Sequence, residues 1–298
     1  TAAFYDVLAA RELVRIAEDN LAQRSRRLDE ATKRRTAGTA TDYDVLAARV
    51  EVDSARPALI RSQNLVLAAR ARLRFLLAEP QEVDVEGALA ALPDPVPSYD
   101  DLLATALQNR PELGEMTTQQ GIYTELIKIA AAGNKPRVDF SANWGKRHLS
   151  LTTLSSSGTA WNAGIFATVP LFDGWRVKGQ VAQVKSTLAS LDLDELKLRE
   201  GITIDVRTAV DNAREAVALL EAVEGPVKQA EQLLFLAEKG YELGVKTRLE
   251  VQDAEQNLNV ARANLAAAQR DYRVARVNLD WVAGTLDGGM PASAAPAK

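Results

Sequence analysis

One long internal repeat constrains the fold of this chain more than any other feature of the sequence. Gly38 and Gly244 lie 206 positions apart, and at this offset the flanking residues align without a gap. The matching pairs include Leu28 with Leu234, Ala31 with Ala237, Lys33 with Lys239, Val45 with Val251, and Leu73 with Leu279. A repeat of this kind predicts two copies of one structural unit.

Each copy has the pattern of a long helix, a short glycine-containing turn and a second long helix. The turns fall at residues 36–41 and 243–247. Gly38 and Gly244 suit the left-handed residue that ends a helix, and Thr41 and Thr247 suit the position that caps the next one. The repeat therefore predicts two helical hairpins whose tips are these turns.

The returning helix of each hairpin carries a heptad pattern of mostly apolar residues, with steps of 3 and 4. The predicted seam positions are Val52, Ala55, Leu59, Ser62, Val66, Ala69, Leu73 and Leu76 in the first copy, and Leu258, Ala261, Leu265, Ala268, Tyr272, Ala275, Leu279 and Val282 in the second. A sustained period of 3.5 residues predicts antiparallel coiled-coil packing.

The composition agrees with long helices. Only 5% of the 298 residues are aromatic. From about Val177 to Tyr241 the sequence has few helix-breaking residues. A continuous helix there would be about 95 Å long at 1.5 Å per residue. Pro57 and Pro226 are expected to kink or interrupt their helices.

The pattern changes between the two repeats. Residues 80–98 contain several prolines and predict an irregular connector, followed by shorter helices at about 99–108 and 111–132. From Arg137 to Trp144, and again from Trp161 to Leu171, apolar and polar residues alternate around a Ser/Thr/Gly loop at Thr152–Thr159. Two such strands match a membrane β-hairpin, with Trp144, Trp161 and Trp175 near its ends, although a soluble sheet gives the same alternation.

If this hairpin lies in lipid, two strands are not enough, because unpaired strand edges are not tolerated in hydrocarbon. The barrel must be completed by further strands, by copies of the same chain, or by both. Oligomerisation is therefore expected. The first residues already read as helix interior without a cap, and we expect sequence upstream of Thr1.

Several function classes have little support in the sequence. The net charge of −4 gives no basic surface for nucleic acid, and the chain has no cysteine. It contains no run of 18 apolar residues that would predict a transmembrane helix. His148 is the only histidine and no Gly-rich phosphate loop occurs, so we predict neither an enzyme nor a cofactor.

Several phrases of the sequence resemble the TolC-like outer-membrane efflux protein family. They are the two turn segments at residues 38–45 and 244–251, Asn109-Arg110-Pro111-Glu112-Leu113, and Pro170-Leu171-Phe172-Asp173-Gly174-Trp175-Arg176. The resemblance implies a homotrimer in which each protomer gives four strands to an outer-membrane β-barrel, while its helices form a tunnel through the periplasm. It also implies passive export, with an inner-membrane pump supplying energy and a periplasmic adaptor binding the hairpin tips.

The resemblance also implies roles for particular residues. Glu250 and Asp253 match the paired acidic residues of the family's gate, where three copies of each would give cation selectivity and possible block by divalent ions. Tyr241, Lys246 and Asp44 match the latch that holds the closed state. Gly38, Thr39, Gly244 and Val245 would contact the adaptor.

The predicted organisation is mainly α, with two coiled-coil hairpins and a β-hairpin that joins a trimeric barrel. Two alternatives remain beside this prediction: a periplasmic adaptor, which would have one hairpin flanked by β domains, and a soluble coiled-coil scaffold. The predicted segments are an outer hairpin (1–79), an equatorial connector (80–135), a membrane strand pair (136–173), an inner hairpin (174–285) and a disordered tail (286–298).

Overall fold

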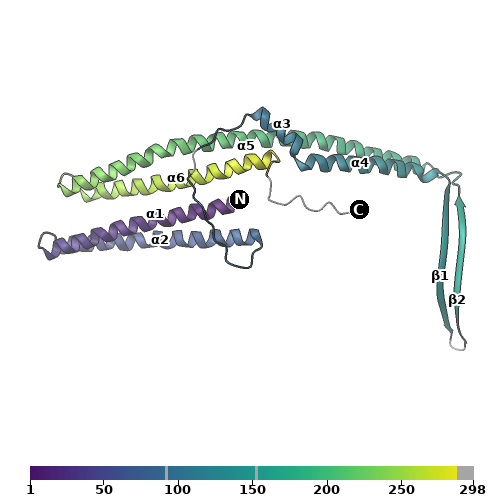
Figure 1. Cartoon of the computed structure of the whole chain (residues 1–298), viewed down its shortest axis with the longest axis horizontal. Helices are drawn as coiled ribbons and strands as arrows, with labels where there is room; N and C mark the ends of the chain where they lie inside the picture. Colours follow the sequence, from purple (N-terminus) through teal and green to yellow (C-terminus); the bar gives the residue numbers. More distant parts are fainter. Residues whose placement is uncertain (91–92, 152–153, 287–298) are drawn as a thin grey trace. The chain divides into compact units, whose positions relative to one another are not determined.

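The structure is a computed structural model that describes residues 1–90, 93–151 and 154–286. Most of these residues are helical, and one two-stranded sheet accompanies the helices (Figure 1). The chain forms two compact units, the first containing residues 1–109 and the chain from Ile202 onward, the second Arg110–Gly201. The fold is mainly α, as the sequence predicts. The tail beyond residue 286 lies outside the described residues.

The first hairpin consists of α1 (Ala2–Thr36) and α2 (Asp42–Leu77), which run antiparallel (Figure 1). Along α2 the buried residues fall largely on the predicted heptad positions, while Leu76 at the end of that seam is exposed. The buried heptad positions are Val52, Ala55, Ser62, Val66 and Leu73. Ser62 satisfies its hydroxyl within the helix by donating to the Leu59 carbonyl at 2.9 Å.

The second hairpin pairs the later part of α5 (Arg176–Glu242) with α6 (Arg248–Val282). Near the turn, one apolar cluster contains Ala230, Leu234, Ala237, Val251, Ala254 and Leu258. Further from the turn, a second cluster contains Ala216, Leu220, Ala268 and Tyr272. Small residues alternate with large ones in both clusters, which lets the two helices pack closely.

Neither internal proline interrupts its helix. Pro57 lies within the 36 residues of α2, and Pro226 lies within the 67 residues of α5. Of the two predicted effects, a kink or an interruption, the structure therefore excludes the interruption at both sites. Each helix has buried apolar residues on both sides of its proline, among them Val52 and Val66 in α2 and Leu220 and Leu234 in α5, and their packing outweighs the one backbone hydrogen bond that proline removes.

The connector that follows α2 makes contacts with α1, α2 and α6 of the first unit. Val85 and Leu89 pack against Val7 and Leu8 of α1. Asp84 accepts ion pairs from Arg11 and, at 2.8 Å, from Arg70. The backbone N–H of Asp94 donates to the Tyr272 hydroxyl at 2.8 Å, and α3 (Tyr99–Asn109) follows.

The second unit contains α4 (Pro111–Ala131), the short 3-10 helix η1 (Ala132–Asn134), and the strands β1 (Arg137–Leu151) and β2 (Leu154–Thr168). Pro111 stands at the start of α4 as predicted, where its missing N–H has no helical partner to lose. The strands are antiparallel, and Trp144 lies directly opposite Trp161.

The strands differ in length from the prediction. The loop predicted at Thr152–Thr159 is largely strand, because β2 begins at Leu154; Thr152 and Thr153 lie outside the described residues. The Ser, Thr and Gly residues of this segment pair through backbone hydrogen bonds, and the pattern of side chains does not reveal such pairing. At the other end β2 stops at Thr168, so Val169 and Leu171 lie beyond it, before and after Pro170.

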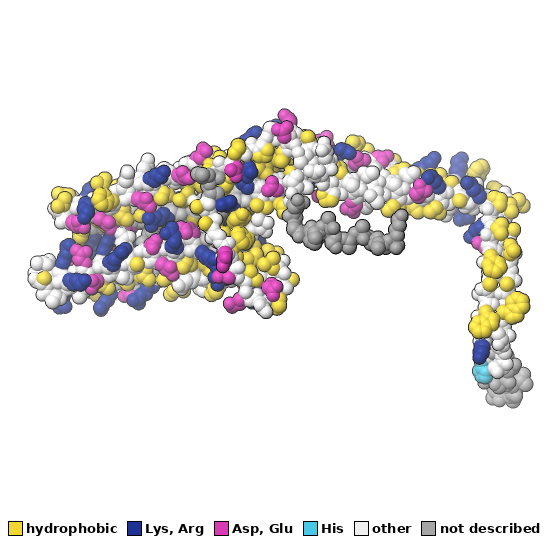
Figure 2. All heavy atoms as spheres, in the orientation of Figure 1, with side chains coloured by type: hydrophobic (Ala, Val, Ile, Leu, Met, Phe, Trp, Pro, Cys, Tyr) yellow, Lys and Arg dark blue, Asp and Glu magenta, His cyan; other side chains and the backbone are white. Residues whose placement is uncertain are grey.

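The apolar side chains of the sheet are largely exposed. Val138, Phe140 and Trp144 of β1 are 69–76% exposed, and Trp161 and Ile165 of β2 are 75% and 74% exposed. Figure 2 shows hydrophobic side chains along this strand pair, whereas charged side chains of both signs cover the helices of the first unit. Among the helices that the structure describes, none is long and apolar enough to cross a membrane.

Candidate functional site at the hairpin tips

The turn of the first hairpin is built as a helix ending followed by a helix start. Gly38 has a φ of +75°, the left-handed conformation that glycine adopts without strain. The N–H groups of Gly38 and Thr39 donate to the carbonyls of Arg35 and Arg34, both at 2.9 Å. These bonds satisfy the last carbonyls of α1 and confirm the predicted role of the glycine.

α2 then starts with a reciprocal cap. The Asp44 N–H donates to the Thr41 hydroxyl at 3.3 Å, and the Thr41 N–H donates to the Asp44 carboxylate at 2.8 Å. The Thr41 hydroxyl also donates to this carboxylate at 2.7 Å. These bonds from Thr41 lower the pKa of Asp44, with a smaller contribution from the charge of Arg248. The predicted cap at Thr41 is confirmed.

The second turn repeats this construction. Gly244 has a φ of +73°, and the N–H groups of Val245 and Lys246 donate to the Gly240 carbonyl at 2.9 and 3.0 Å. A side chain at Gly240 would collide with the side-chain carbons of Lys246, which folds back over this position. Gly240 was not among the predicted residues, although a glycine four residues before the turn glycine is visible in the sequence.

Glu250, which the sequence predicts as a gate residue, takes part in the cap of α6. Its carboxylate accepts from the Thr247 N–H at 2.7 Å and from Lys246 Nζ at 2.5 Å. Its own N–H donates to the Thr247 hydroxyl at 3.3 Å. The bonds from Lys246 and Thr247 lower the pKa of Glu250 from 4.5 to about 2. Glu250 is therefore a carboxylate that stays charged in moderately acidic solution.

The other residues predicted at the tips are accessible. Asp253 is exposed one turn after Glu250, and Val245 and Tyr241 are 76% and 46% exposed. Thr39 donates its hydroxyl to the Arg34 carbonyl at 3.1 Å. Within residues 1–90, 93–151 and 154–286, no group of three or more potential ligands could hold a metal ion.

Two of the three residues predicted as a latch have local partners in this structure. Lys246 bonds to Glu250 of its own hairpin, and Asp44 bonds to Thr41 of its own hairpin. In the part of the chain that the structure describes, neither Lys246 nor Tyr241 has an ion pair or hydrogen bond with Asp44. A latch made of Tyr241, Lys246 and Asp44 stays a prediction.

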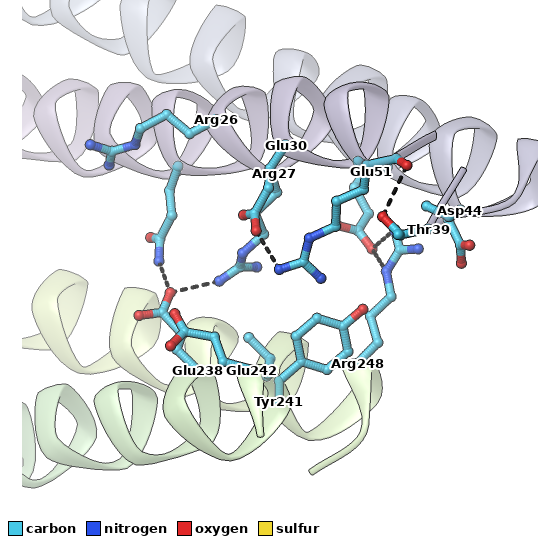
Figure 3. Close-up of a pocket in the computed structure, with 16 residues that line it drawn as sticks. Arg26, Arg27, Glu30, Thr39, Asp44, Glu51, Glu238, Tyr241, Glu242 and Arg248 are labelled. Atoms are coloured by element: carbon cyan, nitrogen blue, oxygen red, sulfur yellow. Dashed lines mark hydrogen bonds and ion pairs between the residues drawn. The ribbon is translucent and has the colours of Figure 1, made fainter. Parts of the chain in front are cut away.

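Other charged residues join the two hairpins. Arg27 of α1 contacts Glu238 of α5 at 2.8 Å, and Arg248 of α6 contacts Glu51 of α2, with Nε 2.7 Å from the carboxylate oxygen. Figure 3 shows these two arginines reaching across the space between the hairpins in opposite directions. They border a cavity of about 480 Å³ that Arg26, Asp44, Tyr241 and Glu242 also line.

One member of this charged group is almost fully buried. The side chain of Glu255 is 2% exposed, and Arg27 Nη1 lies 2.6 Å from its Oε1. Burial raises the pKa of Glu255, which the positive charges of Arg27 and Arg24 partly oppose. Glu255 was not among the predicted residues, but its spacing is a signal in the sequence. It stands four residues after Val251 and three before Leu258, on the apolar face of α6.

This architecture of paired helical hairpins and an amphipathic strand pair is that of outer-membrane channel proteins. The crystal structure of the Campylobacter jejuni CmeC outer membrane channel superposes with a TM-score of 0.71 at 15% identity, covering 95% of this chain and 61% of that one. The outer membrane protein VceC of Vibrio cholerae gives a TM-score of 0.66 at 22% identity, covering 95% of this chain and 68% of that one.

The family model described as "Outer membrane efflux protein" matches residues 1–79 and 102–285, so the chain belongs to this family. It is 25% identical to the outer membrane protein TolC of Escherichia coli K12, over 96% of this chain and 60% of that protein. It is 27% identical to the alkaline protease secretion protein AprF of Pseudomonas aeruginosa, over 84% of this chain and 53% of that protein. The chain thus spans little more than half the length of these relatives. Membership of this family supports a transport role and not an enzymatic one.

Proposed function

We propose that this chain is most of one protomer of an outer-membrane channel that extends through the periplasm. The channel gives substrates a passive exit from a tripartite efflux system or a type I secretion system. The observation that carries this proposal is the pairing of two capped helical hairpins with a strand pair whose apolar residues are exposed. The family match supports the same function, and the names of the relatives include both efflux pumps and a secretion protein.

The membrane part of the proposed protomer is the strand pair. Val138, Phe140 and Trp144 share one face of β1, and Trp161 and Ile165 lie opposite on β2, so this face is apolar while Asp139, Ser141 and Asn143 alternate with it. Strands of 15 residues exceed the 9–11 that cross a bilayer at a tilt. Closure then requires strands from other protomers, and we propose a homotrimer with a shared β-barrel in outer-membrane lipid.

The helical part would form the periplasmic tunnel, with the two hairpins as coiled coils. Its tips, at Gly38 and Thr39 and at Gly244 and Val245, are exposed turns of defined backbone geometry. They are suited to docking by a periplasmic adaptor, which would link the channel to an inner-membrane pump. The proposal includes the segment boundaries predicted from the sequence: 1–79, 80–135, 136–173, 174–285 and 286–298.

The gate is proposed at Glu250 and Asp253. In a trimer, the first turn of α6 would bring three copies of each carboxylate around the axis. Rings of like charge attract cations and repel anions, and they can bind a divalent ion. The three predicted latch residues, Tyr241, Lys246 and Asp44, would hold this constriction closed.

Single-channel conductance of the full-length protein in a planar bilayer tests the channel and the gate together. We expect a small cation-selective conductance, and we expect Glu250→Ala/Asp253→Ala to lose selectivity and block by divalent ions. Asp280→Ala is the matched control, because Asp280 is an exposed acid near the other end of α6. Wild-type selectivity in the double variant would exclude the gate at these residues, and a failure to insert would contradict the channel.

A further inference from the structure

We propose that the junction between the strand pair and its flanking helices binds the phosphate groups of anionic phospholipids in the periplasmic leaflet of the outer membrane. The proposal rests on the proposed function, since it names the lipid that this end of the membrane part meets. The junction consists of η1 with Lys135, which lead into β1, and of residues 169–178, which lead from β2 into α5. Figure 2 shows Lys and Arg side chains beside hydrophobic ones where these helices meet the strand pair.

Three large apolar side chains of the junction are exposed. Leu171 is 95% exposed, Phe172 82% and Trp175 71%. They come shortly after the end of β2, so they continue the exposed apolar residues of the strand pair toward α5. Single exposed apolar residues are ordinary on a protein surface, whereas a group of them marks a site that meets a membrane or another protein. Tryptophan in particular is enriched where hydrocarbon gives way to lipid headgroups.

The backbone of the junction holds Trp175 in a conformation that bulky residues rarely adopt. Gly174 has a φ of +63° and Trp175 a φ of +65°. The left-handed conformation is free of strain at a glycine but strained at a tryptophan. The Asp173 carboxylate fixes this turn by accepting from the Trp175 N–H at 3.0 Å and from the Val177 N–H at 2.9 Å. Strain of this kind persists where a side chain has a function, and the side chain presented here is an exposed indole.

A lysine of α5 lies over this indole. Lys178 Nζ is 5.1 Å from the centre of the Trp175 ring, a cation–π contact that keeps the ammonium group beside the exposed apolar side chains. In the part of the chain that the structure describes, Lys178 forms no ion pair with a carboxylate. Its charge is therefore available to an anionic ligand that also contacts the indole.

Two further basic residues belong to the junction. Arg176 follows Trp175 directly, and Lys135 is exposed at the end of η1. These segments are close together, because a side-chain carbon at Gly133 of η1 would lie 3.0 Å from a methyl group of Val177. Among the described residues, neither Arg176 nor Lys135 has an ion pair with a carboxylate. The junction thus has a positive charge that no described acid neutralises by direct contact.

This combination of groups fits an anionic phospholipid better than a soluble anion. A soluble anion would use the cations alone, whereas the apolar side chains between them gain free energy among acyl chains. Lys and Arg have apolar stems that lie along such a surface while the charged ends reach the phosphates. Asp173 already accepts from the backbone N–H groups at the start of α5, so the phosphate contacts fall to the side chains. The junction is at the helical end of the strands, which in the proposed channel is the periplasmic end.

The test uses the full-length protein in vesicles that mix phosphatidylcholine with phosphatidylglycerol. Trp175 is kept as the sole tryptophan by replacing every other one with phenylalanine. Its fluorescence is then quenched by a brominated form of one lipid or of the other, and the two quenching curves give the relative affinity of the lipids at this site. We expect a preference of roughly fivefold for phosphatidylglycerol, the effect of one Lys or Arg near an anionic surface. High ionic strength should weaken this preference.

The variant Arg176→Gln/Lys178→Gln should lose the preference and keep the quenching by brominated phosphatidylcholine. The control, Arg214→Gln/Lys228→Gln, removes two exposed cations from the part of α5 in the other unit and should keep the preference. Equal affinity for the two lipids in the parent protein, or a preference that survives Arg176→Gln/Lys178→Gln, would overturn the phosphate site and leave the channel standing. Absence of quenching by either lipid would contradict the membrane placement of the strand pair as well.

Discussion

Glu250 shows how one side chain can have a structural role and still be available for a functional one. It fixes the first turn of α6 through Thr247, in the same way that Asp44 fixes α2 through Thr41. These bonds use one oxygen of the carboxylate, while the other accepts from Lys246. The cap thus holds this negative charge in position, and the bonds from Lys246 and Thr247 together keep it ionised.

The low pKa of Glu250 leads to a prediction about pH. A depressed carboxylate pKa gives stabilisation that is complete above the ordinary value of 4.5 and is lost as the pH falls through about 2. In an Asp253→Asn channel, where Glu250 is the remaining gate acid, cation selectivity should therefore persist at pH values just below 4.5. Reversal potentials measured across a pH series check this.

A further substitution in the Asp253→Asn channel tests whether Lys246 causes the low pKa of Glu250. Lys246→Met removes the largest contribution to the low pKa, so selectivity should disappear at a higher pH than in the parent. Lys239→Met is the control, because Lys239 pairs with Glu242 on the other side of the turn. If cation selectivity in both variants depends on pH as it does in the Asp253→Asn channel, the bond from Lys246 does not hold Glu250 ionised.

At the level of elements, a buried hydroxyl of α6 binds the connector, beside the bonds that Arg273 and Arg276 donate to the Ala90 and Pro95 carbonyls. Tyr272 is 2% exposed, and its oxygen accepts the Asp94 N–H. Tyr272→Phe keeps the packing but leaves that N–H without this acceptor, so we expect a loss of about 1–3 kcal/mol of unfolding free energy. Chemical denaturation measures it.

Tyr43→Phe is the matched control for this experiment. Tyr43 is 76% exposed on α2, and loss of an exposed hydroxyl should change stability by less than about 0.5 kcal/mol. Equal effects of the two substitutions would show that the Asp94–Tyr272 bond does not stabilise the folded state.

The helices, turns and caps could be predicted from the sequence because their determinants are local. Thr41, Thr247 and the two turn glycines each act on residues at most five positions away. The ends of the strands could not be predicted in the same way. Ser155 to Thr159 pair through the backbone, and a run of Ser, Gly and Thr gives no alternation of apolar and polar residues.

At the scale of the whole molecule, the charged contacts between the hairpins depend on which helices become neighbours. Arg27 and Glu255 are far apart in the sequence, and a heptad pattern does not specify which partner a hairpin packs against. The one local signal was a carboxylate on the apolar face of α6. Such a residue requires a buried cation, and the fold supplies Arg27.

In the proposed channel, one polypeptide supplies both a periplasmic helical part and a membrane-crossing strand pair. Single cysteines placed along residues 138–144 of the full-length protein in lipid vesicles test this arrangement, since these 298 residues contain no native cysteine and any elsewhere can be replaced by serine. Spin labels at each position then report access to oxygen, which dissolves in lipid, and to a water-soluble paramagnetic reagent.

We predict an alternation of period two in this scan. Labels at Val138, Phe140, Ala142 and Trp144 should be accessible to oxygen, and labels at Asp139, Ser141 and Asn143 to the water-soluble reagent. Equal access of the water-soluble reagent to every position would place the strand pair in water. That result would contradict the channel and favour the soluble coiled-coil scaffold.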